Sequence, residues 1–332
     1  MSEPASGDED DGGSPSRASD AHAGRGAHPD PACVTSPPAA GADESPYAAA
    51  PVRAVVAEVA GVLERAGIAQ PRDEARDIVA ALLDVPRFWP SVNRDAPLDD
   101  ECATAALAAA RRRAGGAPFA YAVGRAAFRH LTLDVDERVL IPRQETELLV
   151  ELVLEESGGA GELAVDVGTG SGAIALALAT EGRFARVVGT DVSLDALEVA
   201  RRNARHLAGA LRSRVEFRAG ALLAPVAGER ASVVVSNPPY IAYSEAAELP
   251  AGVRDWEPAL ALFSGDNGMA ATAAIVRDAA AVLLPGGLLA LEVDARRASL
   301  AAEMCLADGR YGDVRVRLDL AGRERFVLAR RE

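Results

Sequence analysis

A strand–turn–helix–strand pattern at residues 163–191 constrains the fold of this chain more than any other segment. Residues 163–167 (LAVDV) are an apolar run, 168–172 (GTGSG) a glycine turn, 173–180 an apolar helix and 187–191 (VVGTD) a second apolar run. Further strands are predicted at residues 215–217, 233–235, 288–293, 314–318 and 325–328, with helices at 193–202, 270–284 and 295–306. Alternating strands and helices predict a mostly parallel, doubly wound α/β sheet. Its last two strands are expected to be antiparallel neighbours at one side.

The glycine turn predicts a nucleoside-containing cofactor. Glycine lets a ligand approach the backbone closely at the N-terminus of a helix. Asp191 follows about 20 residues later, at the tip of the next strand, where a carboxylate can accept hydrogen bonds from ribose hydroxyls. The turn alone fits two cofactors. The spacing Gly168-x-Gly170-x-x-Ala173 satisfies the loose dinucleotide pattern, whereas Asp166, two residues before the first glycine, is typical of S-adenosylmethionine sites.

Residues 236–241 (SNPPYI) predict where an acceptor group binds. The two prolines end the preceding strand because neither can donate to a ladder, and each keeps the residue before it extended. The Asn237 side-chain oxygen and the Pro238 carbonyl can then accept both N–H bonds of a planar nitrogen, with Tyr240 packed against the flat group. A simple strand followed by a Pro-Pro turn also fits. The stretch suits methyl transfer and offers nothing to hydride transfer, so it favours S-adenosylmethionine over NAD.

The sequence before residue 163 divides into three parts. Residues 1–50 are rich in small and acidic residues and are expected to form a disordered acidic tail. Residues 51–118 predict a helical domain: one helix from Val52 to near Gly67, one over 73–83, and one capped by Asp99 or Asp100 that ends at Gly115. Periodicity does not distinguish simple packing from substrate docking. Residues 119–142 predict a β-hairpin linker with Leu131, Leu133 and Val135 on one face, and residues 143–332 the domain that contains the sheet.

A helix is expected from Pro142 through Leu154, since proline and acidic residues are ordinary in a first helical turn. Arg143 does not fit that pattern, because a cation there lies beside the positive end of the helix dipole. We therefore expect Arg143 to face an anionic group such as a carboxylate.

Length, charge and composition limit the ligands, partners and cellular compartment that this chain can have. The chain has 332 residues, enough for about two domains, and its net charge of −14 argues against broad binding to nucleic acid. The three cysteines and four histidines form no metal or redox spacing, so we expect no metal site and a reducing compartment. No apolar run is long enough for a membrane span, and no signal sequence is evident. A cytoplasmic monomer without stably bound nucleic acid or membrane is expected.

Over about residues 51–332 the chain resembles the protein-(glutamine-N5) methyltransferases that modify bacterial peptide chain release factors, the HemK/PrmC family. The resemblance rests on a combination of motifs that is far more specific than any one of them. They are residues 140–147 (LIPRQETE), 166–179 (DVGTGSGAIALALA), 200–204 (ARRNA), 236–241 (SNPPYI), and 256–258 (WEP) leading to 266–269 (DNGM).

This resemblance implies a Rossmann-like, seven-stranded S-adenosylmethionine methyltransferase sheet with a small N-terminal helical domain that helps hold the release factor. It implies methylation of the side-chain amide nitrogen of the glutamine in a Gly-Gly-Gln motif. The implied substrate-binding residues are Asn237, Pro238, Pro239 and Tyr240, with Asn237 and Pro238 catalytic and Arg143 and Glu147 as secondary candidates. The cofactor-binding residues expected from the glycine turn and the resemblance are Asp166, Gly168, Thr169, Gly170, Ser171, Gly172, Asp191, Leu222 and Asn237.

The chain departs from the family pattern at one position. Similar enzymes usually carry an acidic residue near the adenine, after the third strand, whereas this chain has Ala221 there, followed by Leu222 at the adenine-packing position. One hydrogen bond to the cofactor is then missing or comes from the backbone.

Four other functions fit parts of the sequence. An adenine or guanine amino-methyltransferase acting on nucleic acid also uses an Asn-Pro-Pro-Tyr turn, although the acidic charge counts against it. A glutamine methyltransferase of a ribosomal protein differs only in substrate. The glycine turn also fits an NAD-dependent dehydrogenase. A binding protein without catalysis is supported only by Ala221.

Overall fold

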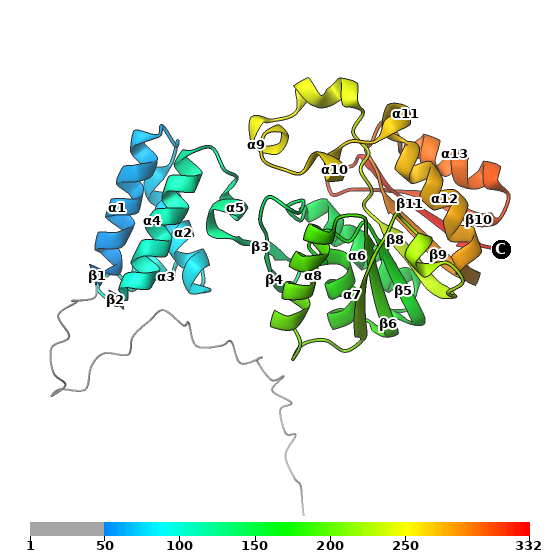
Figure 1. Cartoon of the computed structure of the whole chain (residues 1–332), viewed down its shortest axis with the longest axis horizontal. Helices are drawn as coiled ribbons and strands as arrows, with labels where there is room; N and C mark the ends of the chain where they lie inside the picture. The colour runs from blue at the N-terminus through cyan, green and yellow to red at the C-terminus, as the bar shows by residue number, and fades with distance from the viewer. Residues whose placement is uncertain (1–49) are drawn as a thin grey trace, which may run out of the picture.

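The structure, a computed structural model, describes residues 50–332, so the acidic tail expected at residues 1–50 lies outside the described residues except for Ala50. Figure 1 shows a group of N-terminal helices beside an α/β sheet, with a short helix and a hairpin between them. Within the described residues, no helix has the length and hydropathy required to cross a membrane.

The N-terminal group is built from three main helices whose apolar faces meet in one core. Val59, Leu63 and Ile78 are among its buried side chains. The Asp99 carboxylate accepts a hydrogen bond from the backbone N–H of Cys102 at 2.7 Å, which identifies Asp99 as the cap of the third predicted helix. The elements are β1 (Ala50–Pro51), α1 (Val52–Arg65), α2 (Pro71–Leu83), α3 (Trp89–Val92), β2 (Pro97–Leu98) and α4 (Asp100–Ala114). The three predicted helices are confirmed, although α2 begins two residues early, because proline is well suited to the first helical position.

A hairpin of β3 (Arg125–Phe128) and β4 (Leu131–Asp134) connects this group to the sheet. The hairpin was predicted, and Leu131, Leu133 and Val135 are all buried as expected. The short helix α5 (Phe119–Val123) that precedes it was not predicted. Tyr121 explains this helix: its side chain is fully buried and its hydroxyl donates to the Val139 carbonyl at 2.5 Å, so tertiary packing decides the local conformation.

The sheet has seven strands in the order β10-β11-β9-β8-β5-β6-β7. The five strands from β9 to β7 are parallel, and β11 is antiparallel to both of its neighbours, β9 and β10. This confirms the predicted doubly wound sheet with two antiparallel strands at one side. The strands are β5 (Ala160–Val167), β6 (Arg183–Asp191), β7 (Arg214–Ala219), β8 (Ala231–Ser236), β9 (Leu283–Glu292), β10 (Tyr311–Leu318) and β11 (Glu324–Arg331).

Helices cover both faces of this sheet, which explains why its central strands are apolar without alternation. One apolar cluster joins Val165 and Val234 to the helices after β8 and β9, and the other joins Ala164 and Val233 to the helices on the opposite face. The helices on the first face are α12 (Ala270–Val282) and α13 (Ala298–Asp308); those on the second are α6 (Gln144–Glu156), α7 (Ala173–Glu181) and α8 (Leu194–His206). Short helices follow β7 and β8: η1 (Ala224–Val226), η2 (Tyr243–Glu248), α9 (Ala251–Arg254), α10 (Ala259–Leu262) and α11 (Gly265–Gly268).

The boundary predicted between the helix at 270–284 and the strand at 288–293 differs in the structure. The helix α12 ends at Val282 and β9 begins at once, with Leu283 paired to Ala231. The pairing then shifts so that Leu288 faces Val233. The intervening Pro-Gly-Gly segment is therefore an irregularity inside the strand, where a proline cannot donate and Gly286 takes a φ of +77°.

Candidate active site

A cavity of about 280 Å³ lies at the C-terminal ends of the parallel strands. In open α/β sheets this edge is where ligands bind. Six of the twelve predicted substrate- and cofactor-binding residues line the cavity: Gly168, Gly170, Asp191, Leu222, Asn237 and Pro239. The remaining ones, Asp166, Thr169, Ser171, Gly172, Pro238 and Tyr240, are close to it in the chain but do not line it.

The two halves of the site are adjacent because β5 and β8 are neighbours in the sheet. Val167, the last residue of β5, is paired with Ser236, the last residue of β8. The Ser236 hydroxyl also donates to the Val167 carbonyl at 2.7 Å. Gly168 and Asn237 therefore leave the sheet from the same level of neighbouring strands, although 69 residues separate them.

The glycine turn depends on backbone conformations that other residues rarely adopt. Gly168 and Gly170 have φ values of +72° and +54°, and a Cβ at either position would meet no atom within 4 Å. These two positions therefore need glycine for its backbone conformation, and no side chain fills the space where a Cβ would lie. This open backbone lies just before the N-terminus of α7, and a helix N-terminus is a favourable place for a polar or anionic ligand group.

Asp166 supports this turn from inside the protein. It is fully buried, and its Oδ2 accepts hydrogen bonds from the Thr169 hydroxyl at 2.6 Å and from the Ala175 N–H at 3.1 Å. Its Oδ1 has no hydrogen-bond partner among the described residues. Burial raises the pKa of Asp166 to about 7. The carboxylate therefore ties the turn to α7 instead of facing the cavity.

Asp191 combines a structural contact with free acceptor capacity. Its Oδ2 accepts a hydrogen bond from the Gly170 N–H at 2.9 Å, and its Oδ1 accepts one from the Ser193 N–H at 2.9 Å. A carboxylate offers about four lone-pair sites, so each oxygen can accept one further bond. Because Asp191 also lines the cavity, it can bind a pair of hydroxyl groups there.

The wall after β7 is apolar and has no carboxylate. Ala221 and Leu222 both line the cavity. Leu222 has a φ of +47°, and its carbonyl accepts a hydrogen bond from the Thr190 hydroxyl at 2.7 Å, which holds this uncommon conformation. Val192 and Leu260 are exposed and line the same cavity, so a flat apolar group can be held between these side chains.

The Asn237 side chain is anchored at one end. Its Nδ2 donates to the Thr146 hydroxyl at 3.0 Å, and that hydroxyl donates to the buried Glu292 carboxylate at 2.7 Å. Burial raises the pKa of Tyr240 to about 12, with a smaller contribution from the nearby charge of Glu292. Pro238 is buried and Pro239 lines the cavity. The amide oxygen of Asn237, at the other end, makes no hydrogen bond within residues 50–332.

Arg143 does face a carboxylate, as its position predicted. Its Nη2 lies 2.5 Å from Oε1 of Glu257, and Oε2 of Glu257 accepts a hydrogen bond from the Ile141 N–H at 3.3 Å. Glu147, the other secondary candidate, accepts a bond from Arg129 only through its backbone carbonyl. The Arg143–Glu257 pair is therefore a contact between two segments that flank the cavity.

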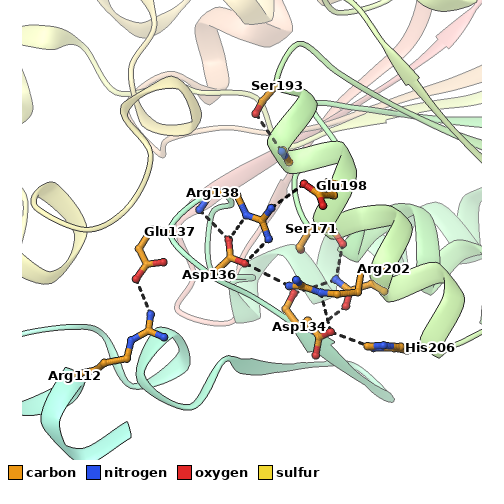
Figure 2. A network of polar contacts seen from close by, with 12 residues as sticks. Arg112, Asp134, Asp136, Glu137, Arg138, Ser171, Ser193, Glu198, Arg202 and His206 are labelled. Atoms are coloured by element: carbon orange, nitrogen blue, oxygen red, sulfur yellow. Dashed lines mark hydrogen bonds and ion pairs between the residues drawn. The ribbon is translucent and has the colours of Figure 1, made fainter. Parts of the chain in front are cut away.

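A polar network holds the end of the hairpin against α8 (Figure 2). Arg138, which lines the cavity, donates to both oxygens of Asp136 at 2.8 and 2.7 Å and to Glu198 of α8 at 3.0 Å. The hydrogen bonds from Arg138 to Asp136 are the main cause that lowers the pKa of Asp136 to about 2. Arg202 of α8 donates to Asp136 as well, at 3.3 Å. The network fixes the cavity wall that the linker contributes.

Asn203 connects that wall to the glycine turn. Its Nδ2 donates to the Ser171 carbonyl at 2.9 Å and to the Asp134 carbonyl at 3.0 Å, while its Oδ1 accepts from the Asp134 N–H at 2.8 Å. The side chain is almost fully buried. No role was assigned to Asn203, Thr146, Glu257 or Glu292 from the sequence. A signal for the first three was available, since each lies in a motif that carries the family resemblance.

Two family models match the chain. The PrmC N-terminal domain matches residues 54–124, and the methyltransferase small domain matches residues 143–250. Among solved structures, a methyltransferase from Pyrococcus furiosus has a TM-score of 0.47 at 20% identity, covering 61% of this chain and 90% of that one.

Curated relatives match over most of their length. The release factor glutamine methyltransferase of Moorella thermoacetica is 41% identical over 287 residues, which cover 84% of this chain and 98% of that protein. The proteins of the same name from Deinococcus radiodurans and Mycolicibacterium smegmatis are 38% and 40% identical, also over 84% of this chain and 98% of theirs. Their identity and coverage extend through both domains, and the chain therefore belongs to the release factor glutamine methyltransferase family.

Proposed function

We propose that the 280 Å³ cavity binds S-adenosylmethionine and that Asn237 and Pro238 hold the glutamine side-chain amide of a peptide chain release factor at its edge. One observation carries this proposal. The glycine turn after β5 and the Asn-Pro-Pro-Tyr turn after β8 leave the sheet side by side, so a cofactor site and an acceptor site adjoin. The activity is that of a protein-(glutamine-N5) methyltransferase.

The cavity residues fit this cofactor. Asp191 keeps acceptor sites for two ribose hydroxyls, and the open backbone at Gly168 and Gly170 leaves room for the polar end of the molecule. Leu222 and Leu260 offer apolar surface for an adenine ring. Asp166 and Thr169 support the turn from beneath. When bound, S-adenosylmethionine supplies a methyl group that is already activated by its sulfonium sulfur.

The protein's contribution to the reaction is mainly position and orientation. An amide nitrogen is a poor nucleophile because its lone pair is delocalised into the carbonyl. If the Asn237 Oδ1 and the Pro238 carbonyl accept its two N–H bonds, the nitrogen is held with its lone-pair face toward the cavity. These two oxygens also stabilise the positive charge that develops on the nitrogen. The proton can leave to solvent after transfer, so no strong general base is required.

The remaining assignments follow from the substrate. Tyr240 packs beside the flat amide, and the N-terminal helices α1 to α4 help to hold the release factor. The methylated residue is the glutamine of the Gly-Gly-Gln motif. Since release factors act on the ribosome, we place the enzyme in the cytoplasm, and we propose that it acts as a monomer.

Mass spectrometry of a purified bacterial release factor, incubated with the protein and S-adenosylmethionine, tests the function. We expect a gain of one methyl group that fragmentation assigns to the Gly-Gly-Gln glutamine. The Asn237→Ala variant should lose most turnover and largely keep its affinity for the cofactor, measured by calorimetry. Transfer only to ribosomal protein or nucleic acid would refute the substrate, and normal turnover by Asn237→Ala would refute the role of Asn237.

A further inference from the structure

Two buried polar side chains lie behind Asn237 and form a chain of hydrogen bonds with it. Asn237 Nδ2 donates to Thr146 Oγ1 at 3.0 Å, and Thr146 Oγ1 donates to Glu292 Oε2 at 2.7 Å. The three residues come from different elements: the turn after β8, the first turn of α6 and the end of β9. Thr146 is 5% exposed and Glu292 1% exposed. A buried carboxylate is costly, so its position directly behind a site residue requires an explanation.

The chemistry of the three groups fixes the direction of the chain. A primary amide has an oxygen at one end and an NH2 at the other, and the two ends have nearly the same shape. A threonine hydroxyl can bind either end, because it both donates and accepts. An ionised carboxylate only accepts, so Glu292 takes the hydrogen of the Thr146 hydroxyl. The lone pairs that remain on Thr146 can then accept only from the Asn237 NH2 group.

We propose that Thr146 and Glu292 are positioning residues that keep the Asn237 amide oxygen, and not its NH2, directed toward the substrate amide. This inference rests on the proposed role of Asn237 as an acceptor. With the amide reversed, its NH2 would meet the NH2 of the glutamine, and one of the two acceptors that orient the nitrogen would be lost. The sheet places Asn237 at the edge of the cavity, and Thr146 and Glu292 determine which end of its side-chain amide faces the substrate.

The protonation state of Glu292 changes with pH, and the direction of the hydrogen bonds depends on it. Burial raises its pKa to about 7, while the hydrogen bond from Thr146 and the charge of Arg325 act in the opposite direction. The other charged or titratable groups that act on Glu292 or feel its charge are Glu145, Arg143 and Tyr240. A protonated Glu292 can donate to Thr146, which then can donate to Asn237. The constraint therefore holds when Glu292 is ionised and weakens as the pH falls through about 7.

A pair of Thr146 variants tests the hydroxyl. Thr146→Val keeps the shape and removes the hydroxyl, whereas Thr146→Ser keeps the hydroxyl. We expect kcat on the release factor to fall on the order of 10- to 100-fold in Thr146→Val, with unchanged affinity for S-adenosylmethionine by calorimetry, and near-normal kcat in Thr146→Ser. Full activity of Thr146→Val, or equal loss in both variants, would overturn the proposal.

Glu292→Gln tests the charge and remains informative if Thr146→Val does not fold. Glutamine is neutral at every pH and resembles the protonated acid. The ratio of wild-type kcat to Glu292→Gln kcat should be close to one near pH 6 and rise roughly 10-fold by about pH 8. A ratio that does not change with pH would contradict the proposal. Asn237→Ala distinguishes the proposed role of Asn237 from the positioning role of Thr146 and Glu292. If Asn237→Ala is inactive while the Thr146 and Glu292 variants behave as wild type, only the positioning role is wrong.

Discussion

Arg143 and Glu257 form an ion pair between segments 114 residues apart in the sequence, with 2.5 Å between Nη2 and Oε1. The Glu257 side chain is 1% exposed and that of Arg143 is 34% exposed. The segments that carry them both contribute to the cavity wall, through Leu140 on one side and Pro258 on the other. The pair therefore joins the two segments beside the cavity, at a place where they share no backbone pairing among the described residues.

Removal of Arg143 should destabilise the fold. In Arg143→Ala the Glu257 carboxylate remains buried without its cation, and breaking a buried pair in this way costs several kcal/mol. Because Arg143 is about one-third exposed, water recovers part of the loss, and we expect a decrease of about 2 kcal/mol in the free energy of unfolding. Denaturant unfolding at neutral pH measures it.

The matched control is Arg112→Ala. Arg112 pairs with Glu137 at 2.6 Å, but both side chains are almost half exposed (Figure 2). An exposed pair contributes less than about 1 kcal/mol. Equal destabilisation by the two substitutions would show that burial of Glu257 is not the cause.

Asp191→Asn should weaken cofactor binding. The substitution removes the charge and places an NH2 group against the N–H of Gly170 or Ser193, while one acceptor for the ribose is lost. Hydrogen bonds to a charged group contribute about 1.5–3 kcal/mol, so the Kd for S-adenosylmethionine should rise on the order of 10- to 100-fold. Calorimetry measures it. Asp195→Asn, which removes the same charge from an exposed position on α8, should leave the Kd unchanged.

Ala221→Asp should strengthen cofactor binding. Ala221 lines the cavity at the position where similar enzymes carry an acidic residue. A carboxylate there can accept a hydrogen bond from the adenine amino group, and a net gain of about 1 kcal/mol corresponds to a Kd lower by roughly 5-fold. Ala224→Asp adds the same charge to an exposed residue outside the cavity wall. A similar improvement in both variants would indicate a general effect of charge.

Asp166 should make stability depend on pH. Its pKa rises from 3.8 to about 7 on folding, chiefly through burial. The raised pKa means that the folded state favours the protonated acid. Its contribution to stability is therefore complete below about pH 4 and is lost as the pH rises through about 7. Relative to Asp166→Asn, the wild type should lose about 4 kcal/mol of unfolding free energy across this interval and then level off. Glu292 titrates in the same range but is present in both proteins, so its effect cancels in the difference. A flat difference would place the Asp166 carboxylate in a polar environment.

The sequence was most informative at the ends of strands. Parallel strands place their C-terminal ends at one edge, so the glycine turn, Asp191 and Asn237 could be assigned to one site before the strand order was known. The seven-stranded sheet expected from the family resemblance is confirmed as well.

Contacts between distant segments could not be predicted in the same way. The chemistry of Arg143 indicated a carboxylate partner, but nothing local identifies Glu257 among the 49 acidic residues of the chain. Glu292 looks like the polar end of an apolar strand, and nothing local predicts that it is buried and accepts a hydrogen bond from Thr146 of α6. The five residues of α5 are too few for a helical period to be visible. Each of these depends on tertiary packing, which periodicity does not report.

The pairing of Val167 with Ser236 has a consequence for how this enzyme can diverge. Neighbouring strands lie about 4.8 Å apart because backbone hydrogen bonds set that spacing. The offset between the two turns that carry the site is thus a property of the main chain, the same for every sequence that keeps the ladder. Substitutions elsewhere, in the loop of residues 241–269 or in the N-terminal helices, leave this offset unchanged. The distance between the glycine turn and the Asn-Pro-Pro-Tyr turn is therefore conserved as long as β5 and β8 stay paired, even where the sequence around the site changes.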